Sequence, residues 1–380
     1  MNDREWVDVG AVDELAQEPV QEIRIGRMRI AITFKEGEFG ALSGVCNHVG
    51  GPLGKGTLEG DFVTCPWHFW KFHRTTGLGE PGFEQDAVPR HPVRVAGGRV
   101  QVQVRPATKR SRLPHEPHPL AREPQREEGP LRILGISTTA MNLERPRYST
   151  SEDLLETALA HAASEFACAT RLLRVRDLRF RACEGFYSKS AHACTWPCSI
   201  TQMDPDDQMD RVYEGVVHWA DVILVATPIR WGSASSLYFK MVERMNCIQN
   251  QETIANRQLL HNKVVGLFVT GGQDNIQAVV GQMLGFFSEL GCHFPPYPFV
   301  AHSRGWSAED MENNTLYVQC SEVLHEGARA LVGRCAGLAQ LLIRGALKDT
   351  PKARGGRKGH ELDTRAQLPP RDPRRPIETR

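Results

Sequence analysis

The feature that most constrains this chain is a pair of short motifs that combine cysteine with histidine. Cys46 and His48 form the first motif, and Cys65 and His68 form the second after sixteen intervening residues. Two thiolates and two imidazoles can bind one iron of a two-iron centre through sulfur and the other through nitrogen. The same side chains could instead bind zinc or be unrelated, although zinc sites more often use closely spaced cysteine pairs. The N-terminal region is therefore expected to fold around these two loops.

The residues around both motifs permit tight loops. The first motif is followed by Gly50-Gly51-Pro52-Leu53, the second by Trp70-Lys71-Phe72, and Gly77 can close the second loop. With this context the region resembles the Rieske [2Fe-2S] family over about its first hundred residues. The resemblance implies that a [2Fe-2S] cluster is bound by Cys46, His48, Cys65 and His68.

Two departures from the family pattern are visible. Positions 51 and 67 are Gly and Trp, so the disulfide that ties the loops of respiratory Rieske proteins is absent. The head resembles instead the ferredoxin type of oxygenase systems, which implies a lower potential within the family range. Phe69 stands where many relatives carry glycine, and this bears on the backbone conformation just after His68.

Composition divides the 380 residues into four segments. Residues 1–104 contain short alternating runs and a hairpin turn at Gly97-Gly98, which predicts a small all-β domain. Residues 105–130 are rich in proline and charge, which predicts a linker. Residues 131–345 alternate apolar runs with helical periods, and residues 346–380 form a basic end that we expect to be a disordered tail.

The third segment predicts an α/β domain with a doubly wound parallel sheet of five strands. Its strand-like runs alternate with helical patterns of about 10 to 17 residues, and right-handed crossovers then place helices on both faces of the sheet. Ligands of such sheets bind beyond the carboxyl ends of the central strands. Three strand ends are therefore the candidate site.

Hydroxyl groups follow the first of these strands. They lie at Ser137 and Thr139, and again at Ser149-Thr150-Ser151, where a helix is expected to begin. Hydroxyls and free backbone N–H groups at a helix N-terminus suit a phosphate, whereas the plainer interpretation is a helix cap with Glu152 in the first turn. Arg147, in a long intervening loop, is an additional phosphate candidate.

The second and third strand ends resemble those of flavodoxin-like NAD(P)H-dependent FMN reductases. The second end carries a Pro- and Gly-containing loop with an aromatic residue, and the third carries a glycine turn. The likeness runs from about Leu131 to about Phe299 and implies FMN and NAD(P)H as cofactors. It implies that the flavin ring contacts Pro228, Ile229, Arg230, Trp231, Gly232, Ser233, Gly271, Gly272 and Gln273.

A second group of cysteines comprises Cys183, Cys194 and Cys198. Iron–sulfur flavoproteins, which resemble this domain, carry four clustered cysteines in this region for a [4Fe–4S] centre. Because this chain has only three, a second cluster would need a fourth ligand from elsewhere in the chain, and the alternative is that the three are inert or redox-active thiols. The remaining cysteines outside the first domain, Cys168, Cys247, Cys292, Cys320 and Cys335, lie on apolar stretches and are expected in the core.

The overall charge excludes some classes of function. The net charge of +1 produces no strong positive potential that would attract nucleic acid. The sequence contains no run of about 18 apolar residues, so no membrane span is predicted. Without a recognisable secretory leader, and with ten cysteines in a long chain, the protein is expected in the cytoplasm.

The joint presence of both cofactors would make the chain an NAD(P)H-dependent oxidoreductase that passes electrons to a downstream small-molecule or protein acceptor. Flavin exchanges electrons in pairs or singly, whereas a [2Fe-2S] cluster carries one at a time. No side-chain acid or base is required for hydride transfer. Alternatives are a non-enzymatic carrier or redox sensor, or a reductase of quinone, nitro, azo or biosynthetic substrates acting on FMN. The family resemblance also implies a homo-oligomer, a dimer or tetramer.

Overall fold

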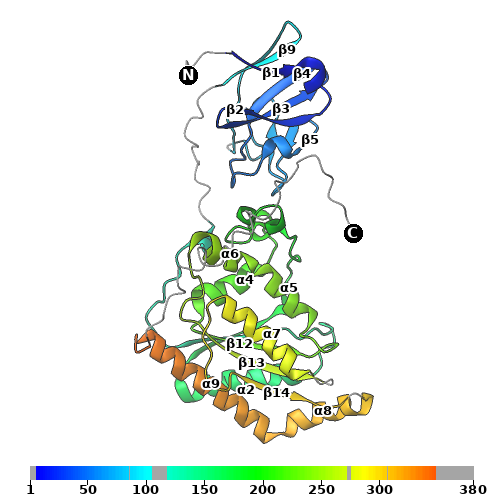
Figure 1. The fold of residues 1–380 in the computed structure, drawn as a ribbon. Coiled ribbons are helices and arrows are strands. Elements are labelled where there is room, and N and C mark those ends of the chain that lie inside the picture. The colour runs from blue at the N-terminus through cyan, green and yellow to red at the C-terminus, as the bar shows by residue number, and fades with distance from the viewer. Residues whose placement is uncertain (1–5, 85, 105–117, 272–274, 306, 348–380) are drawn as a thin grey trace, which may run out of the picture.

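The computed structural model describes residues 6–84, 86–104, 118–271, 275–305 and 307–347. Figure 1 shows a small N-terminal head, residues 6–104, above a larger body, residues 118–347. The predicted tail from residue 348 onward and linker residues 105–117 lie outside the described residues.

The head consists of three small antiparallel sheets, which confirms the all-β prediction. Their strand orders are β1-β9-β8, β2-β3-β4 and β5-β6-β7. The hairpin between β8 and β9 turns at Gly97 and Gly98, whose φ angles of 58° and 73° suit glycine. The strands are β1 (Trp6–Ala11), β2 (Val20–Ile25), β3 (Met28–Lys35), β4 (Glu38–Ser43), β5 (Thr57–Glu59), β6 (Phe62–Thr64), β7 (Lys71–His73), β8 (Val93–Ala96) and β9 (Arg99–Gln103). The short helices are α1 (Val12–Leu15) and η1 (Leu53–Lys55).

The body contains the predicted five-stranded parallel sheet, in the order β11-β10-β12-β13-β14. Its strands are β10 (Arg132–Ser137), β11 (Ala169–Arg174), β12 (Val222–Pro228), β13 (Val264–Gly271) and β14 (Phe299–Ser303). Because the chain leaves β10 in one direction for β11 and in the other for β12, the sheet has a switch point between β10 and β12, where doubly wound sheets bind ligands. β12 and β13 are almost fully buried, as expected of central parallel strands.

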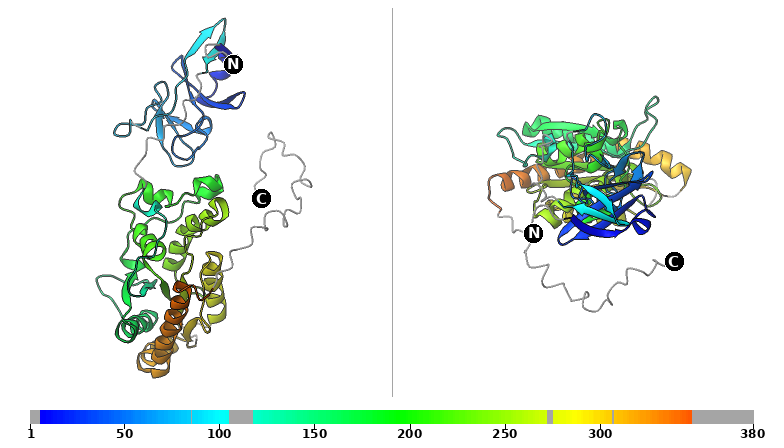
Figure 2. Two further views of the ribbon diagram at one scale, coloured as in Figure 1. Left: turned by 90° about the vertical axis from the view of Figure 1, so that its left-hand side faces the viewer. Right: turned by 90° about the horizontal axis from the view of Figure 1, so that it is seen from above.

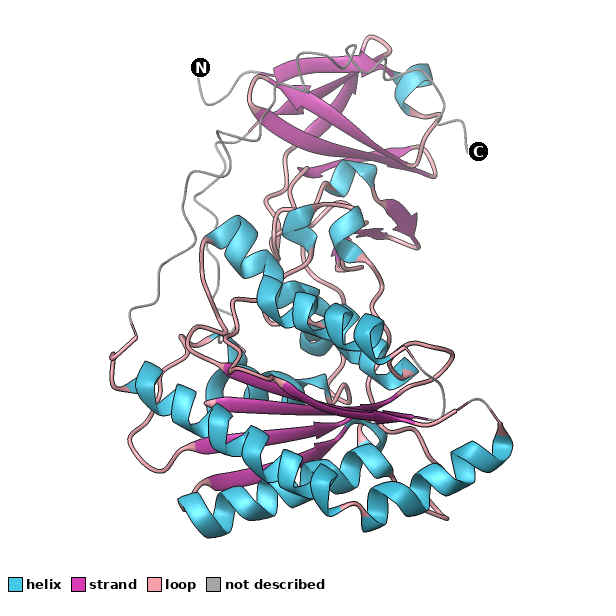
Figure 3. Cartoon of the chain, turned by 60° about the horizontal axis from the view of Figure 1, so that its bottom comes forward, coloured by secondary structure: helices cyan, strands magenta, loops and turns pink. Residues whose placement is uncertain are grey.

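Helices cover both faces of the sheet (Figure 3). One face packs against α2 (Thr150–Phe166) and α9 (Glu322–Ile343), through a core that includes Leu155, Leu224 and Leu331. The other face packs against a core that includes Val225, Met241 and Met283. The elements on this second side are α3 (Ser199–Met203), α4 (Met209–Tyr213), a π-helical turn η6 (Glu214–Trp219), α5 (Ser236–Arg244), α6 (Asn246–Ala255) and α7 (Ile276–Glu289).

The remaining elements also contribute residues to these two cores. They are η2 (Pro119–Ala121), η3 (Val175–Asp177), η4 (Phe186–Ser188), η5 (Ala191–Ala193) and α8 (Ala308–Cys320). The chain leaves the helical conformation at Ser321, so α8 and α9 (Glu322–Ile343) are two separate helices. Among the described helices, none has the length and apolarity needed to cross a bilayer.

Residues 118–130, predicted as part of a linker, pack on the body. Leu120 is buried in the body core, and its carbonyl oxygen accepts hydrogen bonds from Trp196 Nε1 at 3.0 Å and from His218 Nε2 at 3.1 Å. Arg126 also pairs with Asp221 at 2.9 Å. A single apolar residue in a charged segment gives little sequence signal, and only the packed body shows where it binds.

The head contacts the body at one end, as both Figure 1 and the left view of Figure 2 show. Trp67 of the head packs against the core of the head and against the core of the body. The contact lies on the side of η4, η5 and α6, next to the second group of cysteines.

Candidate functional sites in the head and at the sheet edge

The two cysteine–histidine loops of the head lie side by side. The first loop is closed by hydrogen bonds from Cys46 N to Gly51 O at 2.8 Å and from Gly50 N to Cys46 O at 3.1 Å. The second is closed by Cys65 N to Trp70 O at 2.7 Å and Phe69 N to Cys65 O at 3.0 Å. Gly50 and Gly77 both adopt positive φ angles, which is the conformational freedom expected of them.

The two histidine rings of these loops face one another through the same atom. His48 Nδ1 lies 3.2 Å from His68 Nδ1. Nitrogen ligands about 2.1 Å from one tetrahedral metal ion lie about 3.4 Å apart, so this separation fits a shared metal. His68 Nε2 lies 2.5 Å from the carbonyl oxygen of Ala193, which can only accept, so Nε2 carries the proton and the lone pair of Nδ1 is left available to bind a metal.

The two cysteines form a second pair. Both are buried, and a hydrogen bond from Cys46 is the main reason why the pKa of Cys65 falls to about 7. Gly51 leaves room for this pair, since a Cβ at that position would lie 2.7 Å from Cys65 Sγ. Among the residues that the structure describes, no three His, Cys, Asp or Glu side chains are grouped as around a single metal ion. The donors are held as a sulfur pair and a nitrogen pair, which fits a two-iron centre.

Aromatic side chains enclose this site. The His48 ring stacks on Trp70 with centroids 4.5 Å apart and an interplanar angle of 1°. Phe69 has a φ of 63°, so the position where many relatives carry glycine has the backbone conformation that glycine favours. The side chain of Phe69 is 48% exposed.

The body supplies the other wall of the histidine site. The ring of Phe186 meets the ring of His68 edge to face, with centroids 5.1 Å apart. Lys189 Nζ donates to Pro66 O at 2.8 Å and lies 4.7 Å from the centre of the Phe69 ring. Sequence reasoning did not identify Phe186, Lys189 or Ala193, because no local pattern marks residues that act through a contact more than a hundred positions away.

The predicted hydroxyl residues meet at the carboxyl edge of the sheet. Thr139 Oγ1 lies 2.8 Å from Ser149 Oγ and 3.3 Å from Ser151 Oγ, at the start of α2. Thr150 Oγ1 lies 2.6 Å from Thr270 Oγ1 at the end of β13. The structure therefore brings these four predicted residues together beside a helix N-terminus, a donor set that suits a phosphate.

Ser137 and Arg147 are placed differently. Ser137 is fully buried, and its hydroxyl donates to Glu152 Oε2 at 2.5 Å. Arg147 is exposed and donates to Ala140 O at 3.4 Å. In this arrangement Ser137 positions Glu152, and Arg147 is a charge at the rim of the edge.

Glu152 is a charged group that sequence reasoning treated only as part of a helix cap. Its burial would raise the pKa, but hydrogen bonds from Arg176, Ser137 and Arg174 outweigh burial and hold the pKa at about 2. The carboxylate is thus ionised and compensated by two arginines. A phosphate at the neighbouring hydroxyls would not meet an unpaired negative charge.

The loop after β12 presents a flat side chain to the solvent. Trp231 has a φ of 52° and is 94% exposed, and Gly232 follows with a φ of 69°. The loop is held by Arg230 N to Ser233 O at 2.7 Å and by Asn275 Nδ2 to Gly232 O at 2.6 Å. An exposed indole on a fixed loop suits stacking against a planar ring.

The start and end of this loop are fixed by the neighbouring strands. Pro228 pairs with Thr270 across the sheet, and Ile229 N donates to Thr270 O at 2.7 Å. Gly271 lets the two loops approach, because a Cβ there would lie 2.7 Å from Ile229 Cβ. The predicted residues Gly272 and Gln273 lie outside the described residues.

The second group of cysteines lies against the head contact. Cys194 directly follows Ala193 and accepts a hydrogen bond from Asn246 Nδ2 at 3.4 Å, while burial raises its pKa to about 11. A hydrogen bond from Cys247 and the nearby Arg244 guanidinium lower the pKa of Cys198. Cys247 was expected simply in the core; it is buried there, and its contact with Cys198 adds it to this group.

The other core predictions for cysteines hold with one exception. Cys168, Cys292 and Cys335 are buried, whereas Cys320 is exposed at the end of α8. The prediction for Cys320 was wrong because the apolar residues before it do not share one buried face: Val318 is buried, whereas Leu316 is 62% exposed and Tyr317 is 46% exposed. None of the ten cysteines forms a disulfide.

Fold and donor sets together define a two-domain iron–sulfur flavoprotein, and comparison with known proteins gives the families. Residues 5–92 match the Rieske [2Fe-2S] domain, and residues 133–307 match NADPH-dependent FMN reductase. The chain therefore belongs to the Rieske [2Fe-2S] family through its head and carries an NADPH-dependent FMN reductase domain in its body. This confirms the resemblances of both segments and the cofactors that they imply, a [2Fe-2S] cluster, FMN and NAD(P)H.

Individual relatives match one domain or the other. The chain is 34% identical over 110 residues to the ferredoxin component of the alkene monooxygenase system of Xanthobacter autotrophicus, covering 28% of this chain and 88% of that protein. The chain is also 31% identical over 77 residues to 8-demethyl-8-aminoriboflavin-5'-phosphate synthase of Streptomyces davaonensis, covering 20% of this chain and 30% of that protein.

A solved structure spans most of the body. The crystal structure of RosB with bound 8-demethyl-8-formylriboflavin-5'-phosphate is 19% identical with a TM-score of 0.46, and the alignment covers 66% of this chain and 92% of that chain. Two other curated relatives are matched over only 18% and 15% of their own length.

Proposed function

We propose that the protein is an NAD(P)H-dependent oxidoreductase that passes electrons between nicotinamide, FMN at the sheet edge and a Rieske centre in the head, and on to a downstream acceptor. The observation that carries this proposal is the contact between His68 Nε2 and the Ala193 carbonyl oxygen at 2.5 Å. It seats a proposed cluster ligand on the domain that would hold the flavin. Contact through a proposed cluster ligand supports electron transfer between the head and the body.

The two groups supply complementary chemistry when bound, because flavin exchanges hydride or single electrons and a [2Fe-2S] cluster exchanges one electron at a time. Cys46 and Cys65 would bind one iron, and His48 and His68 would bind the other through Nδ1. Trp70 fixes the plane of the His48 ring by stacking on it at 4.5 Å.

At the sheet edge, Thr139, Ser149, Thr150 and Ser151 would bind the phosphate of FMN. Residues 228–233 with Gly271 would hold the ring, and Trp231 offers it a flat, exposed surface. The proposed contribution of these residues is to bind and orient, since hydride transfer needs no side-chain acid or base.

The head is oriented by residues of the body. Lys189 ties the backbone of the second loop through Pro66, and Phe186 packs against the edge of His68. Trp67 is inserted between the two cores. These contacts restrict rotation of the head and keep the His68 side of the loop directed toward the body.

Anaerobic addition of NADPH or NADH to the holoprotein tests the proposal. We expect the flavin absorbance to bleach within the time of one turnover and the cluster absorbance to follow. Flavin that stays oxidised contradicts the proposal and supports the carrier or sensor that a partner protein reduces. Flavin that bleaches while the cluster stays oxidised supports reduction of the final substrate on FMN itself.

The proposed protein is a cytoplasmic homo-oligomer, a dimer or tetramer, without a nucleic acid or membrane partner. The absence of disulfides among its ten cysteines fits a reducing compartment. The nearly complete exposure of Trp231 fits a flavin loop that a second subunit covers. Light scattering after gel filtration tests this, and a monomer with full FMN occupancy contradicts it.

A further inference from the structure

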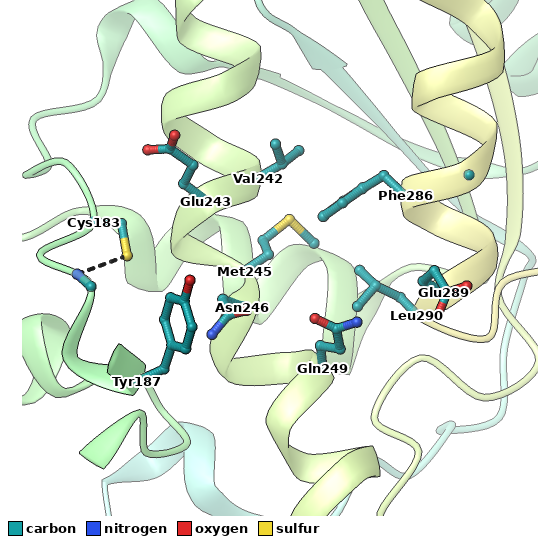
Figure 4. Close-up of a pocket in the computed structure, with 12 residues that line it drawn as sticks. Cys183, Tyr187, Val242, Glu243, Met245, Asn246, Gln249, Phe286, Glu289 and Leu290 are labelled. Carbon is teal, nitrogen blue, oxygen red and sulfur yellow. Dashed lines mark hydrogen bonds between the residues drawn. The ribbon is translucent and has the colours of Figure 1, made fainter. Parts of the chain in front are cut away.

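A cavity of about 590 Å³ opens on the body beside the head contact. It lies between the loop at Cys183–Tyr187, the junction of α5 and α6, and the C-terminal half of α7 (Figure 4). Its size falls in the range of about 300–1,000 Å³ that is typical of small-molecule sites. No residue assigned above to the cluster or to the flavin lines it.

The floor and walls of this cavity are apolar and aromatic. Val242, Met245 and Leu290 are buried and form much of the floor. Figure 4 shows Tyr187 and Phe286 on opposite sides, with Met245 between them. Two rings and a thioether around one space favour a flat aromatic ligand, because rings stack and sulfur makes favourable contacts with ring edges.

The polar groups of the cavity favour a ligand without negative charge. Among the described residues that line it, the charged ones are Glu243 and Glu289, and none is a lysine or arginine. Both glutamates are exposed and lie at the rim of the cavity, so an anionic ligand would approach two negative charges with no lysine or arginine among the lining residues, which disfavours phosphates, nucleotides and sulfonates. The Gln249 amide and the Tyr187 hydroxyl offer hydrogen bonds to a neutral carbonyl or hydroxyl group.

The cavity is also close to the proposed cluster. Tyr187 lines the cavity, and the preceding residue, Phe186, packs against His68 at 5.1 Å between centroids. Consecutive Cα atoms are about 3.8 Å apart, so one short segment contacts both the ligand side chain of the head and the cavity. A molecule bound there would lie within a few side-chain lengths of His68.

We propose that this cavity binds a neutral aromatic carbonyl compound of one or two rings, of the quinone class, as the electron acceptor of the protein. The role as acceptor rests on the function proposed above, whereas the binding site does not. Reduction of one quinone to the hydroquinone consumes two electrons and two protons. Both electrons and one proton come from one NAD(P)H, which is oxidised to NAD(P)⁺, and the second proton comes from water.

Gly285 provides a direct test, because it lines the cavity and a Cβ there would meet no atom within 4 Å. Gly281 lies one turn earlier on the same exposed face of α7, is equally open and does not line the cavity. Gly285→Phe should therefore occupy part of the cavity, and Gly281→Phe is its matched control. Both replace a helical glycine and are expected to keep the fold.

Equilibrium dialysis of the oxidised holoprotein against menadione and against naphthoquinone sulfonate measures binding without turnover. We expect menadione to bind at least about tenfold more tightly than the sulfonate, and Gly285→Phe to weaken it by about tenfold or more. Gly281→Phe should leave its affinity within about twofold. Absence of menadione binding to the wild type, or equal binding of both probes, overturns the proposal.

The control variant distinguishes a quinone site from a contact surface, and one further variant checks the role of charge. If Gly281→Phe weakens menadione binding as much as Gly285→Phe, the face is a contact between copies of the chain, and the proposal is overturned. A Glu243→Gln, Glu289→Gln variant should narrow the preference for menadione over the sulfonate, and an unchanged preference contradicts the role of the two carboxylates. If menadione binds but NAD(P)H does not bleach the flavin, the binding site is supported and the proposed function is rejected.

Discussion

The Nε2 atom of His68 lies 2.5 Å from the carbonyl oxygen of Ala193, a residue 125 positions further along the chain. This hydrogen bond fixes the tautomer of the proposed ligand and joins the head to the body at the same atom. Cys194 directly follows the accepting residue, and the proposed flavin loop, residues 228–233, lies at the far end of α5. The nine residues of α5 correspond to roughly 14 Å of helix rise between the head contact and that loop.

Removal of one sulfur ligand tests the proposed cluster. Cys65→Ser should abolish the bound iron and the visible absorbance of the head, because a two-iron centre needs both thiolates. FMN content should stay unchanged, since the flavin loops lie on the body. Iron and sulfide assays measure the cluster, and a flavin assay measures the FMN content. His73→Asn, which alters a histidine outside the motifs, is the control, and equal iron loss in both variants would contradict the assignment.

Lys189 should hold the head on the body. Lys189→Gln removes the hydrogen bond to Pro66 and the cationic contact with the Phe69 ring. We expect hydrogen exchange in residues 65–70 and 185–194 to accelerate by about tenfold, which corresponds to the loss of about 1.4 kcal/mol.

Lys240 gives a matched control for that variant. Its ammonium lies 4.3 Å from the centre of the Phe180 ring, within the body. Lys240→Gln removes a cationic contact of the same kind without touching the head. Unchanged exchange in Lys189→Gln, or the same acceleration in both variants, would show that Lys189 does not hold the head.

The buried ion pair between Asp207 and Arg244 should make a large contribution to the free energy of unfolding. Both side chains are fully buried, with Nη2 to Oδ2 at 2.7 Å. Asp207→Asn should lower the free energy of unfolding by about 3–5 kcal/mol, because it leaves a buried guanidinium without its counter-charge. A double Asp207→Leu, Arg244→Met variant should be less destabilised than Asp207→Asn. Denaturant unfolding measures both.

Asp206 offers a neighbouring comparison. Its pair with Arg179 spans 3.9 Å, with side chains 72% and 82% exposed. Asp206→Asn should change the free energy of unfolding by less than about 1 kcal/mol. If Asp206→Asn and Asp207→Asn cost the same, the burial of the Asp207 pair does not set its contribution.

His325 should make stability depend on pH. Partial burial acts against its charged form, but hydrogen bonds to the Ser321 carbonyl and to Asp153, both at 2.8 Å, outweigh burial and raise its pKa above 6.5. The stabilisation is therefore complete below pH 6.5 and is lost as the pH rises through the raised value.

The comparison with His325→Gln isolates this effect. The variant should be less stable than the wild type by about 1 kcal/mol at pH 6, and the difference should shrink above the folded-state pKa. Unfolding curves at a series of pH values measure it. A difference that stays constant or grows toward alkaline pH would refute the assigned ion pair between α9 and α2.

The local sequence was enough to predict the features of this protein that depend on residues close together in the chain. The spacing of Cys46, His48, Cys65 and His68 predicts the ligand set, and each loop is closed by hydrogen bonds among its own residues. Strands and helices of the body follow from apolar periodicity, and the order of three loops at one sheet edge follows from parallel topology. Those features need no knowledge of distant contacts.

The tertiary structure decided what depends on residues far apart in the chain. The charged segment that holds Leu120 gives almost no apolar signal, yet Trp196 and His218 anchor it to the body. Cys247 joins Cys198 only because α6 follows α5 toward the head, and Ala193 meets His68 only because the head docks there. Burial and hydrogen bonding are properties of the packed chain. The roles of these residues are therefore set by neighbours in space that are far away in the sequence.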